Sequence, residues 1–476
     1  NNDFIIDKIY IDAYQQESNA SGESYPIAKS KLDNLLSSGV LFFNYCGHAG
    51  YNNLASEQML TTKEVREMTN QNQGFWMLAT CSFGRFDAHT ESAAESAILN
   101  PQGGAIGIMA SCRTVYETQN ERLNEILCRN LFTRDESGHF PHTIGEAVRL
   151  AKNDFAKRYR DKNKLPYILL CDPALKLLYP DDYSIQVSQL PDTLRALSKN
   201  VLQGYIADFD GDTVRDFNGV VSLTLFDKMQ QITTNDNDQK NDDKKVRYTY
   251  NDYPNTIFNG SAMVEDGKFS LSFMVPKDIR YNYDNGHLTL YATDTLTHEE
   301  ATGYNNRFTI GGSEEMLISD TIGPEVHIWL NNPAFKDGDD VSAQPHFYAS
   351  ISDENGINTV GNGIGHDLLL VIDNDIKQSY MLNSYFTARQ GSYQQGDISY
   401  RLSELPDGQH QLSFRAWDLL NNSTTATLNF NVVSGMDPVL YSVIAYPNPV
   451  NSGSQVTIQV EHDSPDQVLQ CTFLMY

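Results

Sequence analysis

Two residues that could do chemistry together follow separate apolar runs of the chain. His48 follows the run Val40–Tyr45, and Cys81 follows the run Phe75–Thr80. A free thiol is mostly un-ionised at neutral pH, but a neighbouring imidazole can accept its proton and later protonate a leaving amine. The pair therefore indicates nucleophilic catalysis by a thiol. By spacing alone, a structural histidine beside a glycine turn and a core cysteine remain open alternatives.

Such chemistry also needs donors for the negative charge that develops on the attacked carbonyl oxygen. Backbone N–H groups at a glycine-rich turn can bind this oxyanion. Gly47, Ala49 and Gly50 surround His48, and Cys81 has an N–H group of its own. We expect the backbone of Cys81, Ala49 and Gly47 to form the oxyanion hole.

The elements that must position these residues are short strands and helices. Residues 1–180 alternate apolar runs with amphipathic stretches, which is typical of βαβ units and a parallel sheet. The expected strands are Phe4–Tyr14, Val40–Tyr45, Phe75–Thr80 and Gly104–Ser111. The expected helices are Ile27–Ser37, Thr61–Thr69, Glu91–Leu99, Asn120–Phe132 and Ile144–Tyr159. Thr143 and Glu146 have capping-box spacing at the last helix. Because ligands bind beyond the carboxyl ends of parallel strands, His48 and Cys81 would emerge at one edge of the sheet.

From residue 181 the sequence has the pattern of an all-β protein. Short runs rich in Val, Ile, Tyr and Phe alternate with turns of Asn, Asp and Gly. This length fits two β-sandwiches, at 181–315 and 316–434, and the polar run Thr233–Lys245 is expected to be an exposed loop of the first. The predicted fold class is therefore multidomain, α/β followed by all-β.

Composition excludes some classes of function. The 476 residues include 40% apolar residues and carry a net charge of −26, so the chain is folded protein without the basic stripe that nucleic-acid binding needs. No apolar run approaches the roughly 18 residues of a membrane helix. The chain lacks an initiator Met and stops in a strand-like stretch, so we expect a piece of a longer protein.

The six cysteines form no CxxC pair, which argues against a zinc site. Four of them end or follow apolar stretches and are expected to be buried small hydrophobic residues. These are Cys46, Cys112, Cys128 and Cys171.

Several ordered motifs resemble the gingipain family of cysteine peptidases, which has a caspase-like fold. They are Asn44–His48, Ala79–Gly84 with Phe86–Asp87, Glu95, Gly103–Gly107 and Cys171–Leu175. The resemblance implies an α/β/α peptidase subdomain at 1–180. It also implies that Cys81 is the nucleophile and that His48, 33 residues earlier, is its base.

The chain departs from the family pattern in two places. The family usually has Gly directly after its His, where this chain has Ala49 and then Gly50. The family's catalytic domain also begins upstream of Asn1, so the acidic residue that orients the histidine there has no match. Asp12 is a candidate for that role within the chain, although a turn aspartate is the favoured interpretation.

The resemblance also implies which residues meet the substrate. By analogy, the segment after the fourth strand lines the substrate pocket. Its candidates are Ser111, Cys112, Arg113, Thr114 and Tyr116. Asp87 and Glu95 are expected to support a turn and a helix instead of acting in catalysis.

No cofactor is expected, and the one weak metal candidate is a calcium loop. Asp208, Asp210 and Asp212 have the alternating carboxylates that open such a loop. The twelfth position, which is Glu in an EF-hand, is Gly219 here. A β-turn with solvated aspartates is therefore favoured.

The final segment resembles the start of the C-terminal sorting domain of the type IX secretion system. It contains Ala445–Pro449, Asn451 and Gly453, then alternating Val456, Ile458 and Val460. We expect a partial sorting-type β-sandwich at 440–476. A peptidase, two Ig-like sandwiches and a sorting-type domain follow one another in an order that resembles the sortases of that system.

This resemblance implies a cell-surface enzyme at the outer membrane of a Gram-negative bacterium. It would be a hydrolase, in the manner of a signal peptidase, that removes the sorting domains of secreted proteins. It would transfer the new carboxyl end to an amine of anionic lipopolysaccharide, beside outer-membrane components of the secretion machinery. The alternatives are an ordinary secreted endopeptidase and an inactive peptidase-fold scaffold.

Overall fold

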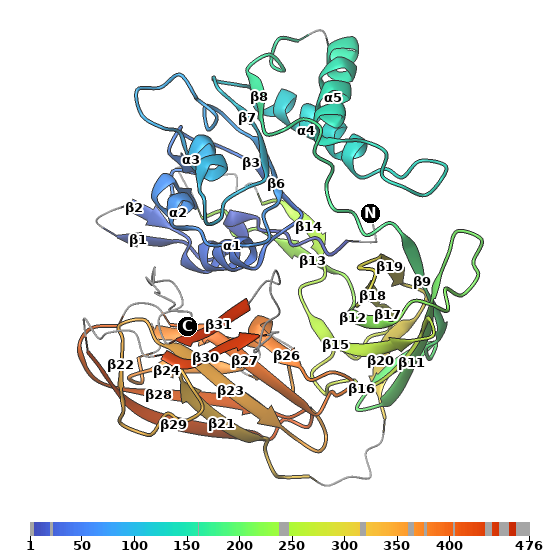
Figure 1. Cartoon of the computed structure of the whole chain (residues 1–476), viewed down its shortest axis with the longest axis vertical. Helices are drawn as coiled ribbons and strands as arrows, with labels where there is room; N and C mark the ends of the chain where they lie inside the picture. Colours follow the sequence, from blue (N-terminus) through green and yellow to red (C-terminus); the bar gives the residue numbers. More distant parts are fainter. Residues whose placement is uncertain are drawn as a thin grey trace. The chain divides into compact units, whose positions relative to one another are not determined.

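The computed structural model divides the chain into two compact units (Figure 1). The described residues are 4–19, 22–159, 161–237, 247–314, 320–359, 366–375, 378–402, 405–433, 440–446 and 457–462. The first unit comprises Asn1–Asp182 and Gln230–Asp252, and the second comprises Tyr183–Met229 and Tyr253–Tyr476. Among the described residues, no helix has the length and apolar character needed to cross a membrane.

A four-stranded sheet forms the centre of the first unit. In spatial order its strands are β3 (Phe42–Cys46), β6 (Phe75–Ala79), β7 (Gly107–Ser111) and β8 (Tyr167–Leu170). The first three strands are parallel, and β8 pairs antiparallel with β7. Two short strands, β4 (Asn53–Leu54) and β5 (Leu60–Thr61), form a hairpin after β3. The strands expected near residues 40–45, 75–80 and 104–111 are confirmed.

Strand β6 is buried on both faces, because its side chains alternate between two hydrophobic layers. Trp76 and Leu78 pack in one layer, and Phe75 and Met77 pack in the other. Helices of the first layer are α1 (Pro26–Ser38), α2 (Thr62–Glu67) and α3 (Ala93–Leu99). Helices of the second layer are α4 (Glu117–Leu131) and α5 (Ile144–Tyr159). The first unit thus has the α/β/α layering that the sequence predicts.

Side-chain caps begin several of these helices. At α3, Ser92 and Glu95 form a complete capping box, as a Thr and a Glu do at α2. Glu95 therefore supports a helix, as expected. The predicted box at α5 is half formed: the Thr143 hydroxyl accepts the Glu146 N–H, but the Glu146 carboxylate pairs with Arg149 instead of reaching back.

The strand expected over Phe4–Tyr14 is wrong. This segment contains a short 3₁₀ helix, η1 (Ile11–Ala13), and forms no pairing with the central sheet. Its aromatic residues make ring contacts instead. The ring centroids of Tyr10 and Tyr250, for example, lie 4.0 Å apart. A small hairpin of β1 (Glu17–Asn19) and β2 (Gly22–Ser24) follows.

Asp12 is a turn aspartate, as favoured above. Its carboxylate accepts the N–H groups of Asp236 and Asn237, each at 2.8 Å. Those residues follow the first strand of a hairpin that belongs to the first unit, although the chain on either side of it belongs to the second. The hairpin consists of β13 (Gln230–Thr233) and β14 (Thr249–Asp252). The expected exposed loop of the first sandwich is therefore wrong for 233–237, and 238–246 lie outside the described residues.

The first all-β part of the second unit is a closed barrel, not the expected β-sandwich. In spatial order its strands are β11 (Lys199–Ala207), β16 (Lys268–Met274), β15 (Thr256–Glu265), β12 (Gly219–Phe226), β18 (His287–Asp294), β19 (Glu300–Asn305) and β9 (Tyr183–Gln189). The barrel closes because β9 pairs with both β11 and β19. A small sheet of β10 (Thr193–Ala196), β20 (Thr309–Ser313) and β17 (Asp284–Asn285) shares its hydrophobic core.

The second all-β part consists of two sheets packed face to face, as the sequence predicts. One sheet contains β21 (Glu325–Leu330), β23 (His346–Ser352), β27 (Gln395–Arg401) and β26 (Phe386–Ala388), with η3 (Asn383–Tyr385) before β26. The other contains β22 (Asp340–Val341), β29 (Ser423–Val432), β28 (Gly408–Trp417), β24 (Leu369–Ile372) and β25 (Ser379–Met381). Their core is continuous, and the rings of Phe347 and Phe414 lie 5.4 Å apart across it.

The final segment contains one antiparallel pair, β30 (Leu440–Tyr446) and β31 (Thr457–His462). The motif residues Pro447–Pro449, Asn451, Gly453 and Val456 lie outside the described residues. The sorting-type domain therefore stays a prediction.

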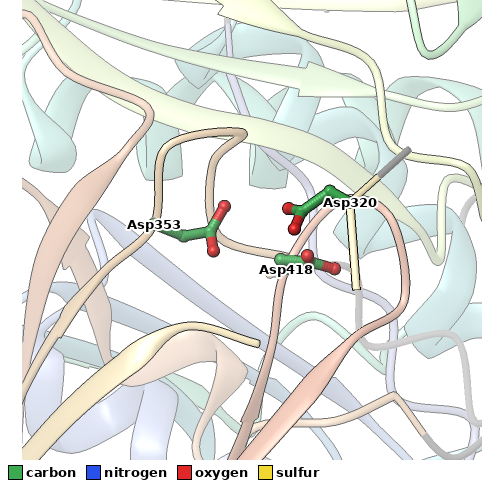
Figure 2. A group of neighbouring side chains, drawn as sticks. All are labelled: Asp320, Asp353 and Asp418. Carbon is green, nitrogen blue, oxygen red and sulfur yellow. The ribbon is translucent and has the colours of Figure 1, made fainter. Parts of the chain in front are cut away.

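Three carboxyl groups converge at loops of the sandwich (Figure 2). Asp353 follows β23, Asp418 follows β28, and Asp320 precedes β21. One oxygen of each lies within 4.8 Å of the others. Burial, together with the two neighbouring carboxyls, raises the pKa of Asp353 to about 6. Its negative charge at neutral pH therefore opposes folding.

We predict that removing this charge stabilises the protein at neutral pH. The folded state holds the proton of Asp353 more tightly than the unfolded chain, so the stabilisation from protonation is present at low pH and is lost as the pH rises through about 6. Asp353→Asn keeps an acceptor for the N–H groups of Asn355 and Gly356. At pH 7.5 it should raise the free energy of unfolding by about 1 kcal/mol, because solvent screens this half-buried group. Urea unfolding followed by tryptophan fluorescence at pH 7.5 and 5.5 measures the effect.

Asp294 provides a control of opposite sign. The N–H groups of Thr297, Asn218 and Leu296 lower the pKa of Asp294 to about 2. Its contribution to stability is present above the unfolded pKa of about 4 and is lost as the pH falls toward 2. Asp294→Asn should therefore destabilise the protein at pH 7.5. If Asp353→Asn also destabilises the protein at pH 7.5, the negative charge of Asp353 does not oppose folding at that pH.

Candidate active site

Strands β3 and β6 are neighbours in the central sheet (Figure 1), and the loops that follow them contain His48 and Cys81. The two strands are parallel neighbours, with Cys46 opposite Ala79. His48 lies two residues beyond Cys46, and Cys81 lies two residues beyond Ala79. The two residues therefore leave the sheet at equal offsets, and the expectation that they share one edge is confirmed.

Hydrogen bonds fix the backbone on both sides of His48. The hydroxyl of Thr80, a fully buried residue directly before the candidate nucleophile, donates to the Gly47 carbonyl. The His48 carbonyl accepts from the Tyr45 hydroxyl at 2.7 Å and from the Ala55 N–H at 2.9 Å. A Cβ atom at Gly47 would lie 2.7 Å from the Tyr45 hydroxyl, so any other residue there would displace the Tyr45 side chain from its contact with the His48 carbonyl. The loop is held in place while the His48 side chain remains exposed to solvent.

The half-buried thiol of Cys81 faces the backbone of Val115. The Val115 N–H donates to Sγ at 3.4 Å, and the thiol donates to the Val115 carbonyl at 3.5 Å. The N–H and the carbonyl of one residue thus hold the sulfur in place. The next residue, Ser82, has a φ of 56°, and its N–H donates to the Arg113 carbonyl at 3.2 Å. Left-handed backbone of this kind is concentrated at functional sites.

No hydrogen bond joins Cys81 to His48 in the part of the chain that the structure describes. Catalytic hydrogen bonds are often long before substrate binds and tighten in the complex. The exposed imidazole of His48 and the fixed backbone beneath it are compatible with such an adjustment.

Part of the predicted substrate pocket is structural support. Ser111 is fully buried, and its hydroxyl donates to the Arg113 carbonyl at 2.7 Å. The Arg113 guanidinium forms a two-point ion pair with Asp87, at 2.9 and 2.6 Å, and lowers the pKa of that carboxyl. Asp87 thus supports a loop, as expected, and it connects the loop after β6 with the loop after β7.

The other pocket candidates are more accessible. Cys112 is half-buried and donates its N–H to the Pro166 carbonyl at 2.9 Å. Thr114 is exposed, and the Tyr116 side chain is 72% exposed. They lie on the same loop as Val115, which contacts the thiol, so their role in binding substrate stays a prediction.

The other described cysteines differ from one another in exposure and in the pKa of the thiol. The expectation that they are buried is wrong: Cys46 is exposed, and Cys112, Cys128 and Cys171 are half-buried. Cys46 ends β3, an edge strand of the sheet, and this position leaves it open to solvent. Burial raises the pKa of Cys128 and Cys171 to about 11 each, which keeps them un-ionised at neutral pH.

Three residues near the thiol were not found by sequence reasoning: Val115, Asn120 and Asn163. An apolar loop residue such as Val115 gives no chemical signal. Asn120 did give a signal in the sequence, because it occupies the apolar face of α4 with Leu123 and Leu127. A polar residue on a buried helix face calls for a specific partner. Asn163 lies in the loop before β8 and gives no comparable pattern.

Within the part of the chain that the structure describes, the candidate groups of metal ligands lie far from His48 and Cys81 in sequence. Asp208 accepts the N–H groups of Asp210 and Asp212 at 3.0 and 2.9 Å, which is the favoured β-turn. Within the described ranges, the one group of three or more potential ligands with suitable spacing is the carboxyl cluster of Figure 2. Hard oxygen ligands of that type suit Ca²⁺. Each of its carboxyls already accepts an N–H from its own loop.

Comparison with known proteins places the first unit in a family. Residues 1–178 match peptidase family C25. No curated protein matches the chain. Among solved structures, latent dimeric PorU from Porphyromonas gingivalis is 26% identical, with 94% of this chain and 40% of that chain covered and a TM-score of 0.36. The complex of the pro- and mature domains of RgpB from the same organism is 16% identical, with 60% and 57% covered and a TM-score of 0.30.

The chain thus spans less than two thirds of the length of either structure. The order of the domains predicted from the sequence resembles that of PorU. The match over residues 1–178 confirms the resemblance carried by the motifs, because peptidase family C25 is the gingipain family of cysteine peptidases.

Proposed function

We propose that this chain carries the catalytic segment of a cysteine endopeptidase, with Cys81 as nucleophile and His48 as general base. The main support is the family match over residues 1–178, combined with the position of both residues at the carboxyl edge of the sheet. Ligands of open α/β sheets bind at that edge. The backbone of Val115 contacts the sulfur through its N–H and its carbonyl and so holds the proposed nucleophile at this edge.

The proposed reaction has two half-steps. The Cys81 thiolate attacks the scissile carbonyl carbon, and the protonated His48 gives its proton to the leaving amine, which leaves an acyl-enzyme thioester. The oxyanion is bound by backbone N–H groups of Cys81, Ala49 and Gly47. Those of Cys81 and Ala49 donate to no other group in the described part of the chain, so they are available for this role.

The second half-step decides between hydrolysis and transfer. If water attacks the thioester, the product is a free carboxylate. If an amine attacks, His48 accepts its proton, a new amide forms, and the Cys81 thiolate is released. We propose transfer: the protein acts at the cell surface as a sortase, and the acceptor is an amine of anionic lipopolysaccharide. Support comes from the order of domains and from the sorting-type motif at Ala445–Pro449.

We predict that Cys81→Ala abolishes both peptidase activity and labelling by a thiol-reactive peptide probe. The variant removes the sulfur that forms the thioester in the proposed reaction, so activity should fall to background. Cys128→Ala is the matched control, because that thiol is half-buried on α4 and should be dispensable. The assay uses the protein with its natural ends, and mass spectrometry locates the probe. Turnover by Cys81→Ala at the wild-type rate would remove Cys81 from the mechanism.

We predict a smaller loss for His48→Ala. Removing a general acid–base group typically costs roughly 10²–10⁴-fold in kcat, while the thiol is still present. Peptide cleavage measured at saturating substrate tests this. His139→Ala, at an exposed histidine before α5, should retain wild-type kcat. A loss of less than about tenfold in His48→Ala would mean that another group serves as the base.

The sortase assignment predicts a phenotype in cells. In cells that carry Cys81→Ala, secreted proteins with sorting domains should keep those domains and fail to attach to lipopolysaccharide. The molecular mass and surface attachment of several such proteins measure this, with Cys128→Ala cells as control. Normal processing and attachment would leave a secreted endopeptidase or an inactive scaffold.

A further inference from the structure

Two buried asparagines connect the strand before Cys81 with the loop that touches its thiol. Asn120 on α4 is 4% exposed, and Asn163 in the loop before β8 is 6% exposed. The Asn163 Oδ1 accepts the Tyr116 N–H at 2.9 Å, and its Nδ2 donates to the Asn120 Oδ1 at 2.9 Å. The Asn120 Nδ2 donates to the Ala79 carbonyl at 3.5 Å. We call this chain of three hydrogen bonds the amide bridge.

The amide bridge has a unique direction. A backbone carbonyl only accepts and a backbone N–H only donates, so Ala79 and Tyr116 fix which end of each side-chain amide faces them. If either amide flipped, two like groups would face each other at both of its contacts. Buried amides are costly to leave unpaired. The bridge therefore specifies one arrangement of the two backbones it joins.

The two ends of the bridge flank the thiol contact. Ala79 lies two residues before Cys81, and Tyr116 directly follows Val115, whose N–H donates to Sγ at 3.4 Å. The Tyr116 N–H belongs to the same peptide group as the Val115 carbonyl, which accepts from the thiol at 3.5 Å, so shifting the Tyr116 backbone would move both contacts of Val115 with the sulfur. Hydrogen bonds to sulfur weaken steeply with distance and misalignment.

We propose that Asn120 and Asn163 are positioning residues that hold the N–H and the carbonyl of Val115 against the sulfur of Cys81 and thereby set the reactivity of its thiol. They touch neither the sulfur nor a substrate, and they act through Val115. The proposal rests on the proposed function only in taking Cys81 as the reactive thiol, since ionisation of the thiol is measurable without turnover.

Other titratable groups near the thiol stay constant in the test. The His48 imidazole lies on the neighbouring loop, and the buried phenol of Tyr167 lies on β8. Burial, with the nearby Cys46 and Cys81, raises the pKa of that phenol, so it remains neutral at the pH values used. Neither group contacts the amide bridge in the described hydrogen-bond network.

The experiment measures the pH dependence of Cys81 alkylation by iodoacetamide, with the modified peptide identified by mass spectrometry. In Asn163→Ala, the midpoint should shift by about 0.5 pH unit or more and the rate at pH 7 should change roughly threefold or more, because thiolate is the reactive form. Asn120→Ala should shift the midpoint in the same direction. The double variant should shift it no further than the larger single change, since both residues act in one chain.

Asn70→Ala is the matched control. Asn70 is a buried amide of the same unit, 7% exposed, and bonds both the N–H and the carbonyl of Gly104, at 2.8 and 3.0 Å. It should lose stability as the bridge variants do but keep the wild-type midpoint. If Asn163→Ala does not fold, Asn120→Ala, which leaves the Tyr116 contact intact, decides the matter.

Wild-type alkylation midpoints in folded bridge variants would overturn the proposal and give the amide bridge a role in stability alone. This outcome is distinct from failure of the proposed function. If the bridge variants change the alkylation of Cys81 but the Cys81→Ala variant still cleaves peptides, the positioning role of the amide bridge stands and the catalytic role of Cys81 is excluded. If Cys81→Ala loses activity but the bridge variants keep the wild-type midpoint, the catalytic role of Cys81 stands and the positioning role of the amide bridge is excluded.

Discussion

The parallel pairing of β3 with β6 is the constraint on which the candidate site depends. His48 and Cys81 are 33 residues apart in sequence, and the register that sets Cys46 opposite Ala79 gives them equal offsets beyond the sheet. A slip of one residue would turn every side chain of the slipped strand to the other face. The register is well specified because β6 buries both faces, so each of its side chains has a layer to which it belongs. The hydrophobic core thus determines where the chemistry emerges.

Loops of the site are held by the backbone groups that β6 and β7 leave unpaired at their ends. Gly84 donates its N–H to the Ser111 carbonyl at 3.0 Å, and Ser82 donates to the Arg113 carbonyl at 3.2 Å. The loop after the nucleophile is therefore attached to the loop that faces the thiol, and the Asp87–Arg113 ion pair joins them again at the surface. Such a scaffold keeps donor and sulfur in fixed geometry, and reactive groups need this support from the residues around them.

The sequence was sufficient for the elements whose patterns are local. The period of α5 predicted Ile144–Tyr159 with the observed bounds, and the apolar runs predicted the three central strands. Residues 4–14 contain many apolar residues but have no clear period, and the strand predicted from them is absent from the central sheet. Closure of the barrel depends on pairing β9 with β19, strands distant in sequence, and no local pattern encodes it. The same holds for Val115, because its contact with the thiol comes from the path of the loop and not from its side chain.

The central claim is that the reaction passes through a thioester on Cys81. The most direct measurement is a rapid acid quench of the protein during turnover of a peptide substrate, followed by mass spectrometry of its digested fragments. The account predicts that the acyl group accumulates on the fragment that contains Cys81, and that an added amine shortens its lifetime as a new amide product appears. An acyl group on another residue, or continued turnover with Cys81 never acylated, would contradict it.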